Sequence, residues 1–358
     1  VASSMALSGY AGHAFTARYR GTGSESADES PLAALLARRY GLELTVVDIE
    51  PDVRDLLEPI VRALDEPHAD ESAIPTWLIS QAVAAQYKVA LAGTGGDELF
   101  AGYRRHLGLL LGELHTRLPG ALRRGASGVA DRLPEPAGAG LGVHRLKRFL
   151  RGQPGDLARR YFGMQDKLSG ARDGLYTTEV EASIRGEPAA ERFAGLWREA
   201  GSPGGLRGAL YLDYKTYLPD DLLHLADRIS MAHSLELRVP FVDHELVEQT
   251  FRLPAWEKVR WGRPKHLLRR ALAPRLPREH LTAVKRGFVG PTAAWLRNEL
   301  RDTLLDELSS SRVARLGLFS PARVDALLDD HFSRRHNHEG ILWGLLCFSV
   351  WHRQYAEA

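Results

Sequence analysis

The residues best placed to do chemistry are two adjacent carboxylates, Asp97 and Glu98, which follow a glycine-rich turn at 93–96. The apolar residues just before the turn predict a buried strand, and those after it predict a helix. The glycines let the backbone approach an anionic ligand and point N–H groups at it. The carboxylates then fit a hard cation such as Mg²⁺, which bridges carboxylate and phosphate oxygens. A tight turn whose acids cap the helix is the alternative, and spacing alone leaves both interpretations open.

The elements that must position this turn alternate between strand and helix. Strands are predicted at 14–19 and 42–49, with an amphipathic helix over 28–40 between them that ends at Gly41. Helices over about 53–64 and 75–86 lead to the strand that begins at Val89. This order predicts an α/β fold with a doubly wound parallel sheet.

The composition is that of an ordinary globular chain, with 358 residues, 44% hydrophobic and 26% charged. The formal net charge of +2 demands neither a nucleic-acid nor a membrane partner. No apolar run approaches the ~20 residues of a transmembrane helix. The one cysteine, Cys347, lies in an apolar run and cannot pair within the chain. We therefore expect a buried thiol rather than a nucleophile, and a reducing, cytoplasmic setting.

Composition shifts divide the chain into three predicted segments. Residues 1–103 form the α/β core, 104–205 a basic helical insertion that contains Pro and Gly, and 206–358 a helical part that runs nearly to the end. The insertion is interpreted as a solvated face of helices, and a surface for RNA or an acidic partner is the alternative.

The second half holds charged residues that could meet a ligand. Asp227, Glu236 and Arg238 are the candidates, although buried acids and arginines also build internal ion-pair scaffolds. Lys285 lies in a predicted loop beside Gly287, from which an amine could reach a phosphate or a developing negative charge. The competing interpretation for Lys285 is an ordinary solvated side chain.

Three histidines lie close together near the end of the chain, at His331, His336 and His338. Asn337 and Gly340 indicate a loop there. The spacing is not that of a helical pair of metal ligands, and zinc binding is therefore not expected.

Six blocks carry a resemblance to a known family, in that family's order and over nearly the whole chain. They are Asp65–Pro75, Gly95–Tyr103, Tyr217–Asp221 with Asp227–Met231, Glu236–Asp243, Lys265–Arg269 and Lys285–Phe288. With them the chain resembles the C-terminal synthetase domain of the glutamine-dependent asparagine synthetases, to which the β-lactam synthetases are related. One block would be weak evidence, whereas six in order are specific.

The resemblance implies an ATP-binding α/β sheet of the pyrophosphatase-loop type, like that of the adenine nucleotide α-hydrolases, with helical additions. It implies ATP and Mg²⁺ as cofactors and an amide-forming ligase. Such an enzyme adenylates a carboxylate, with aspartate the family's commonest, and ammonia or an amine then displaces AMP. Glutamine would supply the ammonia through an N-terminal glutaminase domain. The family's Ser-Gly-Gly-x-Asp-Ser loop would fall just before Val1, so segment 1–103 is expected to lack its first strand and phosphate loop.

The family's residue roles carry over position by position. Asp97 matches the metal-binding acid, and Lys285 matches a mobile-loop lysine that stabilises negative charge. Thr94 stands where asparagine synthetases carry an acid and β-lactam synthetases a tyrosine, at a position facing the acyl acceptor. These three are the catalytic candidates. The expected nucleotide contacts are Ala17, Ala92, Gly93, Gly95 and Gly96, and the candidates for substrate binding are Asp70, Glu236 and Arg238.

Two other functions stay open. The departure at Thr94 fits a tailoring amidotransferase that acts on a sugar, peptide or antibiotic precursor. The missing phosphate loop fits a degenerate module that binds a nucleotide or a partner without catalysis, because a fold alone does not establish a function. For the assembly of the protein, a homodimer is the form that we consider.

Overall fold

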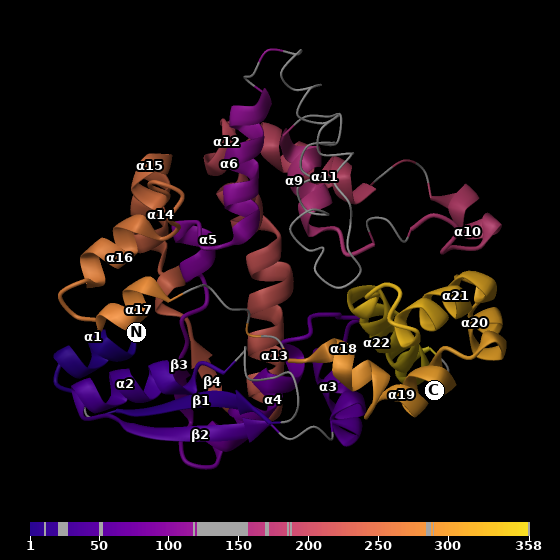
Figure 1. Cartoon of the computed structure of the whole chain (residues 1–358), viewed down its shortest axis with the longest axis horizontal. Helices are drawn as coiled ribbons and strands as arrows, with labels where there is room; N and C mark the ends of the chain where they lie inside the picture. The colour runs from indigo at the N-terminus through magenta and orange to yellow at the C-terminus, as the bar shows by residue number, and fades with distance from the viewer. Residues whose placement is uncertain are drawn as a thin grey trace.

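The computed structural model describes residues 1–10, 12–20, 28–49, 53–116, 119, 157–168, 172–184, 186, 188–283, 288 and 290–356. Over these ranges the protein is a mixed α/β structure, mostly helical, with two short parallel sheets (Figure 1). The loop that carries Lys285 and most of the Pro- and Gly-rich insertion lie outside them. None of the helices described is both long and apolar enough to cross a membrane.

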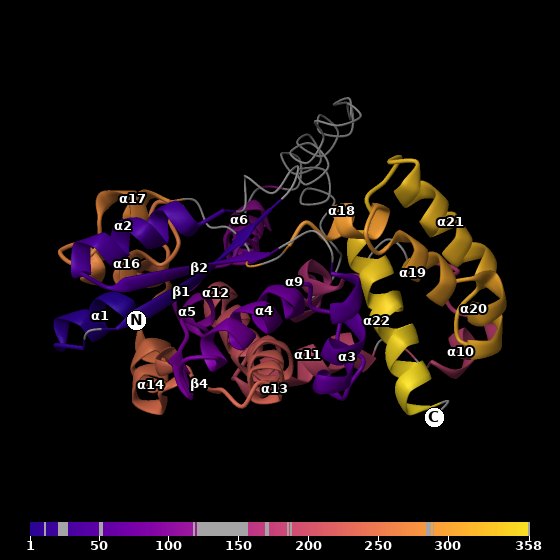
Figure 2. The same ribbon diagram turned by 90° about the horizontal axis from the view of Figure 1, so that it is seen from below.

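The first sheet pairs β1 (His13–Tyr19) with β2 (Glu43–Ile49) in parallel. The connecting helix α2 (Ser30–Tyr40) ends at Gly41, which has a left-handed φ of 63°. Both strands contact α2 and also α4 (Ala73–Ala84), and Figure 2 shows the two helices on opposite sides of the strands. The strands and helices predicted for this region are therefore confirmed.

The second sheet pairs β3 (Val89–Leu91) with β4 (Glu236–Arg238), again in parallel. The sequence predicted β3, but the helical pattern predicted for the second half gave no sign of β4. A strand of three residues is too short to show an alternating pattern, and only its place beside β3 reveals it. The helix α5 (Gly96–Phe100) begins just after β3, as expected.

The remaining elements are mostly helices. In chain order they are α1 (Ala2–Leu7), η2 (Arg54–Leu56), α3 (Leu57–Leu64), α6 (Arg104–Thr116), α9 (Leu157–Gln165), α10 (Thr178–Ser183), α11 (Pro188–Glu199), α12 (Gly205–Lys215), the π-helix η3 (Tyr217–Leu223), α13 (His224–Ala232), η4 (Pro240–Val242), α14 (His244–Arg252), α15 (Ala255–Lys258), α16 (His266–Leu272), α17 (Arg278–Thr282), α18 (Thr292–Arg297), α19 (Arg301–Glu307), α20 (Ser310–Leu316), α21 (Pro321–Phe332) and α22 (Glu339–Tyr355). In Figure 1, α6, α9, α11 and α12 rise together above the sheets, and α18 to α22 form a group at one side.

The main hydrophobic core draws on both ends of the chain. It runs from Ala17 in β1 to residues of α22, where Trp343 is 1% exposed. Segments 1–103 and 206–358 thus share this core, and their separation into segments stays a prediction. Cys347 lies in the same core, 3% exposed, and burial raises the pKa of its thiol to about 12. The predicted buried thiol is confirmed.

Close packing between α11 and α12 gives a first test of the fold. Gly208 of α12 lies so close to Trp197 that a Cβ there would be 2.5 Å from the ring. We expect Gly208→Ala to lower the free energy of unfolding by about 1–3 kcal/mol, although alanine favours helix. Gly195 of α11 is the control, because no described atom lies within 4 Å of its Cβ position. Gly195→Ala is expected to stabilise by about 0.5–1 kcal/mol. Urea unfolding measures the free energy of unfolding of both variants. Equal changes in the two variants would contradict the close contact between Gly208 and Trp197.

Candidate active site

The predicted turn residues Ala92, Gly93, Thr94 and Gly95 span the gap between β3 and α5, and Gly96 begins α5. Position 95 requires glycine for two reasons. Its φ is 95°, and a Cβ there would lie 2.7 Å from Val242 Cγ2. At Gly93, by contrast, no described atom lies within 4 Å of the Cβ position. The backbone at Gly93 is therefore open to a ligand, whereas Gly95 is packed from behind.

Asp97, in the first turn of α5, is paired with a cation. Its Oδ1 lies 3.0 Å from Nζ of Lys265, the residue that precedes α16. Gly102 passes against both side chains, and a Cβ there would overlap the Asp97 carboxylate and the Lys265 stem. Only glycine leaves room for this ion pair. Lys265 was not among the predicted site residues, although its block was part of the resemblance, and that block was the available signal.

Glu98, the second carboxylate, has a different environment. It is 1% exposed and accepts a hydrogen bond from the Tyr103 hydroxyl. Burial raises the pKa of the Glu98 carboxyl above its ordinary value. The two adjacent acids therefore have different environments. Asp97 is half-buried and paired with a cation, whereas Glu98 is part of the interior.

A chain of polar contacts continues from Tyr103 into the upper helices. The Arg105 guanidinium lies 3.8 Å from the centre of the Tyr103 ring and 4.6 Å from that of Tyr217. It also lies 3.1 Å from the carboxylate of Asp213, which is fully buried. The His106 ring contacts the same carboxylate at 2.7 Å. These contacts pair the buried charges and tie α5 to α6 and α12.

A second acid–base pair joins the segment before α4 to the π-helix η3. His68 Nε2 lies 3.0 Å from Oδ1 of Asp221, and burial raises the pKa of the Asp221 carboxyl. Asp70, a predicted substrate ligand, accepts the backbone N–H of Ser72 at 2.7 Å and so shapes the same segment. Short π-helical stretches occur frequently at functional sites, which makes Asp221 a candidate that the sequence reading did not single out.

Among the other predicted residues, three lie at the surface and one is buried. Glu236 and Arg238 pair with each other at 2.8 Å, with side chains 56% and 61% exposed. Asp227 is exposed in the first turn of α13. Ala17 is buried within β1, 8% exposed. Their roles toward a ligand stay predictions.

The raised pKa of Glu98 predicts how stability depends on pH. The folded state holds this proton more tightly than the unfolded chain does, so stability falls as pH rises above the ordinary carboxyl value of 4.5. Glu98→Gln keeps an acceptor for Tyr103 and removes the ionisation. The free energy of unfolding of the variant should therefore fall less than that of the parent between that pH and neutrality. Urea unfolding at both pH values measures the difference.

Glu179→Gln, on an exposed position of α10, is the matched control and should keep the pH dependence of the parent. If the free energy of unfolding of Glu98→Gln depends on pH as that of the parent does, the raised pKa of Glu98 is contradicted.

Known proteins resemble this chain over most of its length. The family model for asparagine synthase matches residues 1–353. "Putative asparagine synthetase (glutamine-hydrolyzing)" of Mycobacterium tuberculosis is 35% identical over 304 residues, which are 84% of this chain and 44% of that protein. Asparagine synthetase (glutamine-hydrolyzing) 1 of Bacillus subtilis is 28% identical over 325 residues, 90% of this chain and 50% of that protein.

A fungal protein, amidase chry2 of Gibberella zeae, is 25% identical over 331 residues, 86% of this chain and 48% of its own length. The chain spans about half the length of these curated relatives. Because the family model covers nearly every residue and the predicted blocks occur in order, the chain belongs to the asparagine synthase family.

Proposed function

We propose that the protein containing this chain is an ATP-dependent carbon–nitrogen ligase that converts a carboxylate, aspartate first, into an amide. The observation that carries the proposal is the Asp97–Lys265 pair, held under Gly102 at the end of β3. Ligands of open α/β sheets bind outside the carboxyl ends of their strands, where this pair lies. The proposed fold is the doubly wound parallel sheet of the pyrophosphatase-loop type, which both parallel strand pairs fit.

In the proposed reaction an oxygen of the substrate carboxylate attacks the α-phosphorus of ATP. The bond to the bridging oxygen breaks, and pyrophosphate leaves with the electron pair. Ammonia or an amine then adds to the acyl carbon and loses a proton, AMP leaves, and the amide forms. Ammonia from glutamine is the proposed nitrogen source, released outside this chain, because the relatives named for glutamine hydrolysis are about twice as long.

The residues at the turn fit an ATP–Mg²⁺ complex. Asp97 would hold Mg²⁺, because carboxylate oxygens are its preferred protein ligands. The Lys265 ammonium, 3.0 Å from the Asp97 carboxylate, indicates that a cation is favoured at this position. When bound, Mg²⁺ neutralises part of the phosphate charge. Lys265 supplies a cation for a phosphate oxygen, and Lys285 a second one for the departing pyrophosphate. The nucleotide contacts proposed are Ala17, Ala92, Gly93, Gly95 and Gly96.

The acyl substrate is the least determined part of the proposal. Thr94 is proposed to face the acyl acceptor, with Asp70, Glu236 and Arg238 as further substrate ligands. A threonine offers a hydroxyl but no carboxylate base. This observation favours one second function, a tailoring ligase that acts on a sugar, peptide or antibiotic precursor.

ATP–pyrophosphate exchange on the full-length protein, with Mg²⁺ and a panel of carboxylates, tests the proposal. Exchange that depends on aspartate supports it, and exchange with another acid supports the tailoring ligase. A folded protein that exchanges with none of the acids would overturn the ligase and favour a non-catalytic binding module.

The metal role of Asp97 predicts a binding defect. Asp97→Asn should weaken Mg²⁺-dependent ATP binding about 10- to 100-fold, the loss of one charge-assisted contact worth about 1.5–3 kcal/mol. Calorimetric titration of ATP with Mg²⁺, and again with chelator, measures it. Asp302→Asn, an exposed aspartate at the start of α19, is the control and should bind as the parent does. Undiminished affinity in Asp97→Asn would count against the assignment.

The role proposed for Lys285 predicts a rate defect with normal binding. Lys285→Ala should leave ATP affinity unchanged and slow pyrophosphate exchange by about 10²-fold or more, because a donor to developing negative charge is lost. The exposed Lys88 offers a control, because Lys88→Ala removes a lysine that has no proposed role and should keep the exchange rate of the parent. An exchange rate equal to that of the parent would retire Lys285 as a catalytic group.

A further inference from the structure

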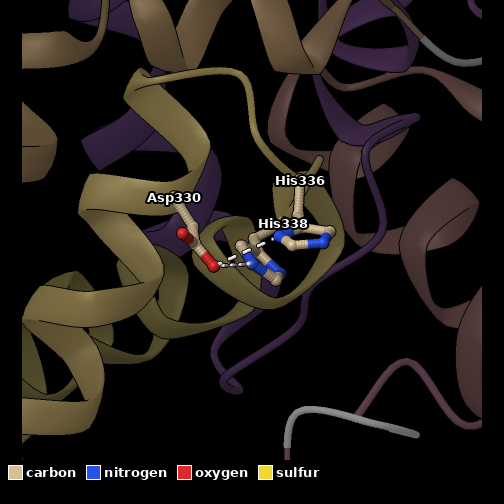
Figure 3. Close-up of side chains that lie close together, drawn as sticks. All are labelled: Asp330, His336 and His338. Carbon is tan, nitrogen blue, oxygen red and sulfur yellow. Dashed lines mark hydrogen bonds and ion pairs between the residues drawn. The ribbon is translucent and has the colours of Figure 1, made fainter. Parts of the chain in front are cut away.

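We infer that Asp330, His336 and His338 form a zinc-binding site at the connection between α21 and α22 (Figure 3). One ligand atom from each of the three side chains lies within 4.8 Å of the other two. The spacing of the three histidines did not indicate such a site, because the third ligand is not His331 but its neighbour Asp330. The inference is independent of the proposed reaction, which uses none of these residues.

Two of the three distances between the ligand atoms match those around a tetrahedral ion. Asp330 Oδ2 lies 3.3 Å from His336 Nδ1 and 3.6 Å from His338 Nε2. Two ligands on zinc, each bonded at about 2.0–2.2 Å, lie about 3.4 Å apart. Figure 3 shows the carboxylate and both rings turned toward one another. Two imidazole nitrogens and a carboxylate oxygen suit zinc, and water completes the fourth position.

Ordinary ion pairing accounts for these contacts less well. Oδ1 of Asp330 is already paired with Arg335 Nε at 2.7 Å, which fixes the carboxylate and leaves Oδ2 for the histidines. The 3.6 Å contact of His338 Nε2 is longer than a hydrogen bond, although that nitrogen is shielded from solvent. A cation between the three atoms would satisfy both rings at once.

His338 is held in place by the core beneath it. Its backbone N–H donates to Nδ1 of the fully buried His331 at 3.2 Å, and Arg297 donates to the His331 carbonyl at 3.0 Å. His331 therefore supports a ligand rather than being one. Such outer contacts orient metal ligands and are part of a built site.

The position of the site gives it a stabilising role. α22 begins at Glu339, directly after His338. In its first turn Gly340 packs against the Glu71–Lys167 ion pair, where a Cβ would lie 3.8 Å from Glu71 Oε1 and 4.0 Å from Lys167 Cδ. A bound ion would thus fasten the start of α22 against the segment that carries Asp70.

Titration of the metal-free, full chain with Zn²⁺ by calorimetry tests the inference. We expect one Zn²⁺ per chain and a rise in Tm with Zn²⁺. His336→Ala, at a side chain 71% exposed, and His338→Ala should each weaken binding at least tenfold, about what disturbing even an outer contact costs. His244→Ala, an exposed histidine in α14, is the control and should bind as the parent does.

Co²⁺ in place of Zn²⁺ provides a second readout, because a tetrahedral site gives it strong visible absorption. His336→Ala is the decisive variant, since its exposed side chain can be removed without disturbing the fold, which circular dichroism checks. The inference is overturned if the parent shows no saturable one-to-one binding. It is equally overturned if His336→Ala, folded, binds Zn²⁺ as tightly as His244→Ala does.

Discussion

Close approach of the chain at Gly102 is the constraint on which the candidate active site depends. The helix α5 lasts only five residues, and the left-handed φ of 59° at Ala101 turns the chain back, so that the Gly102 N–H donates to the Asp97 carbonyl at 2.8 Å. The Lys265 N–H donates to the Phe100 carbonyl at 3.1 Å, which docks the start of α16 onto the same turn. Backbone hydrogen bonds therefore bring Asp97 and Lys265 together, and the absence of a side chain at Gly102 leaves room for their contact.

The charged side chains on the two sides of this turn have different partners. Toward the interior, Glu98, Arg105 and Asp213 belong to one buried network, in which the loss of one partner typically costs about 3–5 kcal/mol. On the other side, the Asp97 and Lys265 side chains are 18% and 26% exposed and form an ion pair at 3.0 Å. The turn thus lies between a polar network in the interior and a partly exposed ion pair.

Local patterns in the sequence predicted the local parts of this arrangement. Alternation gave β1 and β2, and the Gly41 cap gave the end of α2, because these signals lie within a few residues of each other. The three-residue β4 and the Asp97–Lys265 pair depend on segments far apart in the chain, which periodicity does not record. The resemblance marked the two blocks that contain Asp97 and Lys265 but not the pairing of these side chains. The role of Lys285 stays a prediction, because its loop lies outside the described residues.

Charge balance at the turn argues for a ligand that brings its own cation. Paired with Lys265, Asp97 adds no net charge to the turn. A free triphosphate would meet the carboxylate of Asp97 and gain only the one lysine. If the proposed ATP–Mg²⁺ complex binds at this turn, Asp97 would hold the metal ion and Lys265 would be available for a phosphate oxygen. Under the proposed function these residues would therefore favour metal-bound over free nucleotide, because in the structure Lys265 already neutralises the Asp97 carboxylate.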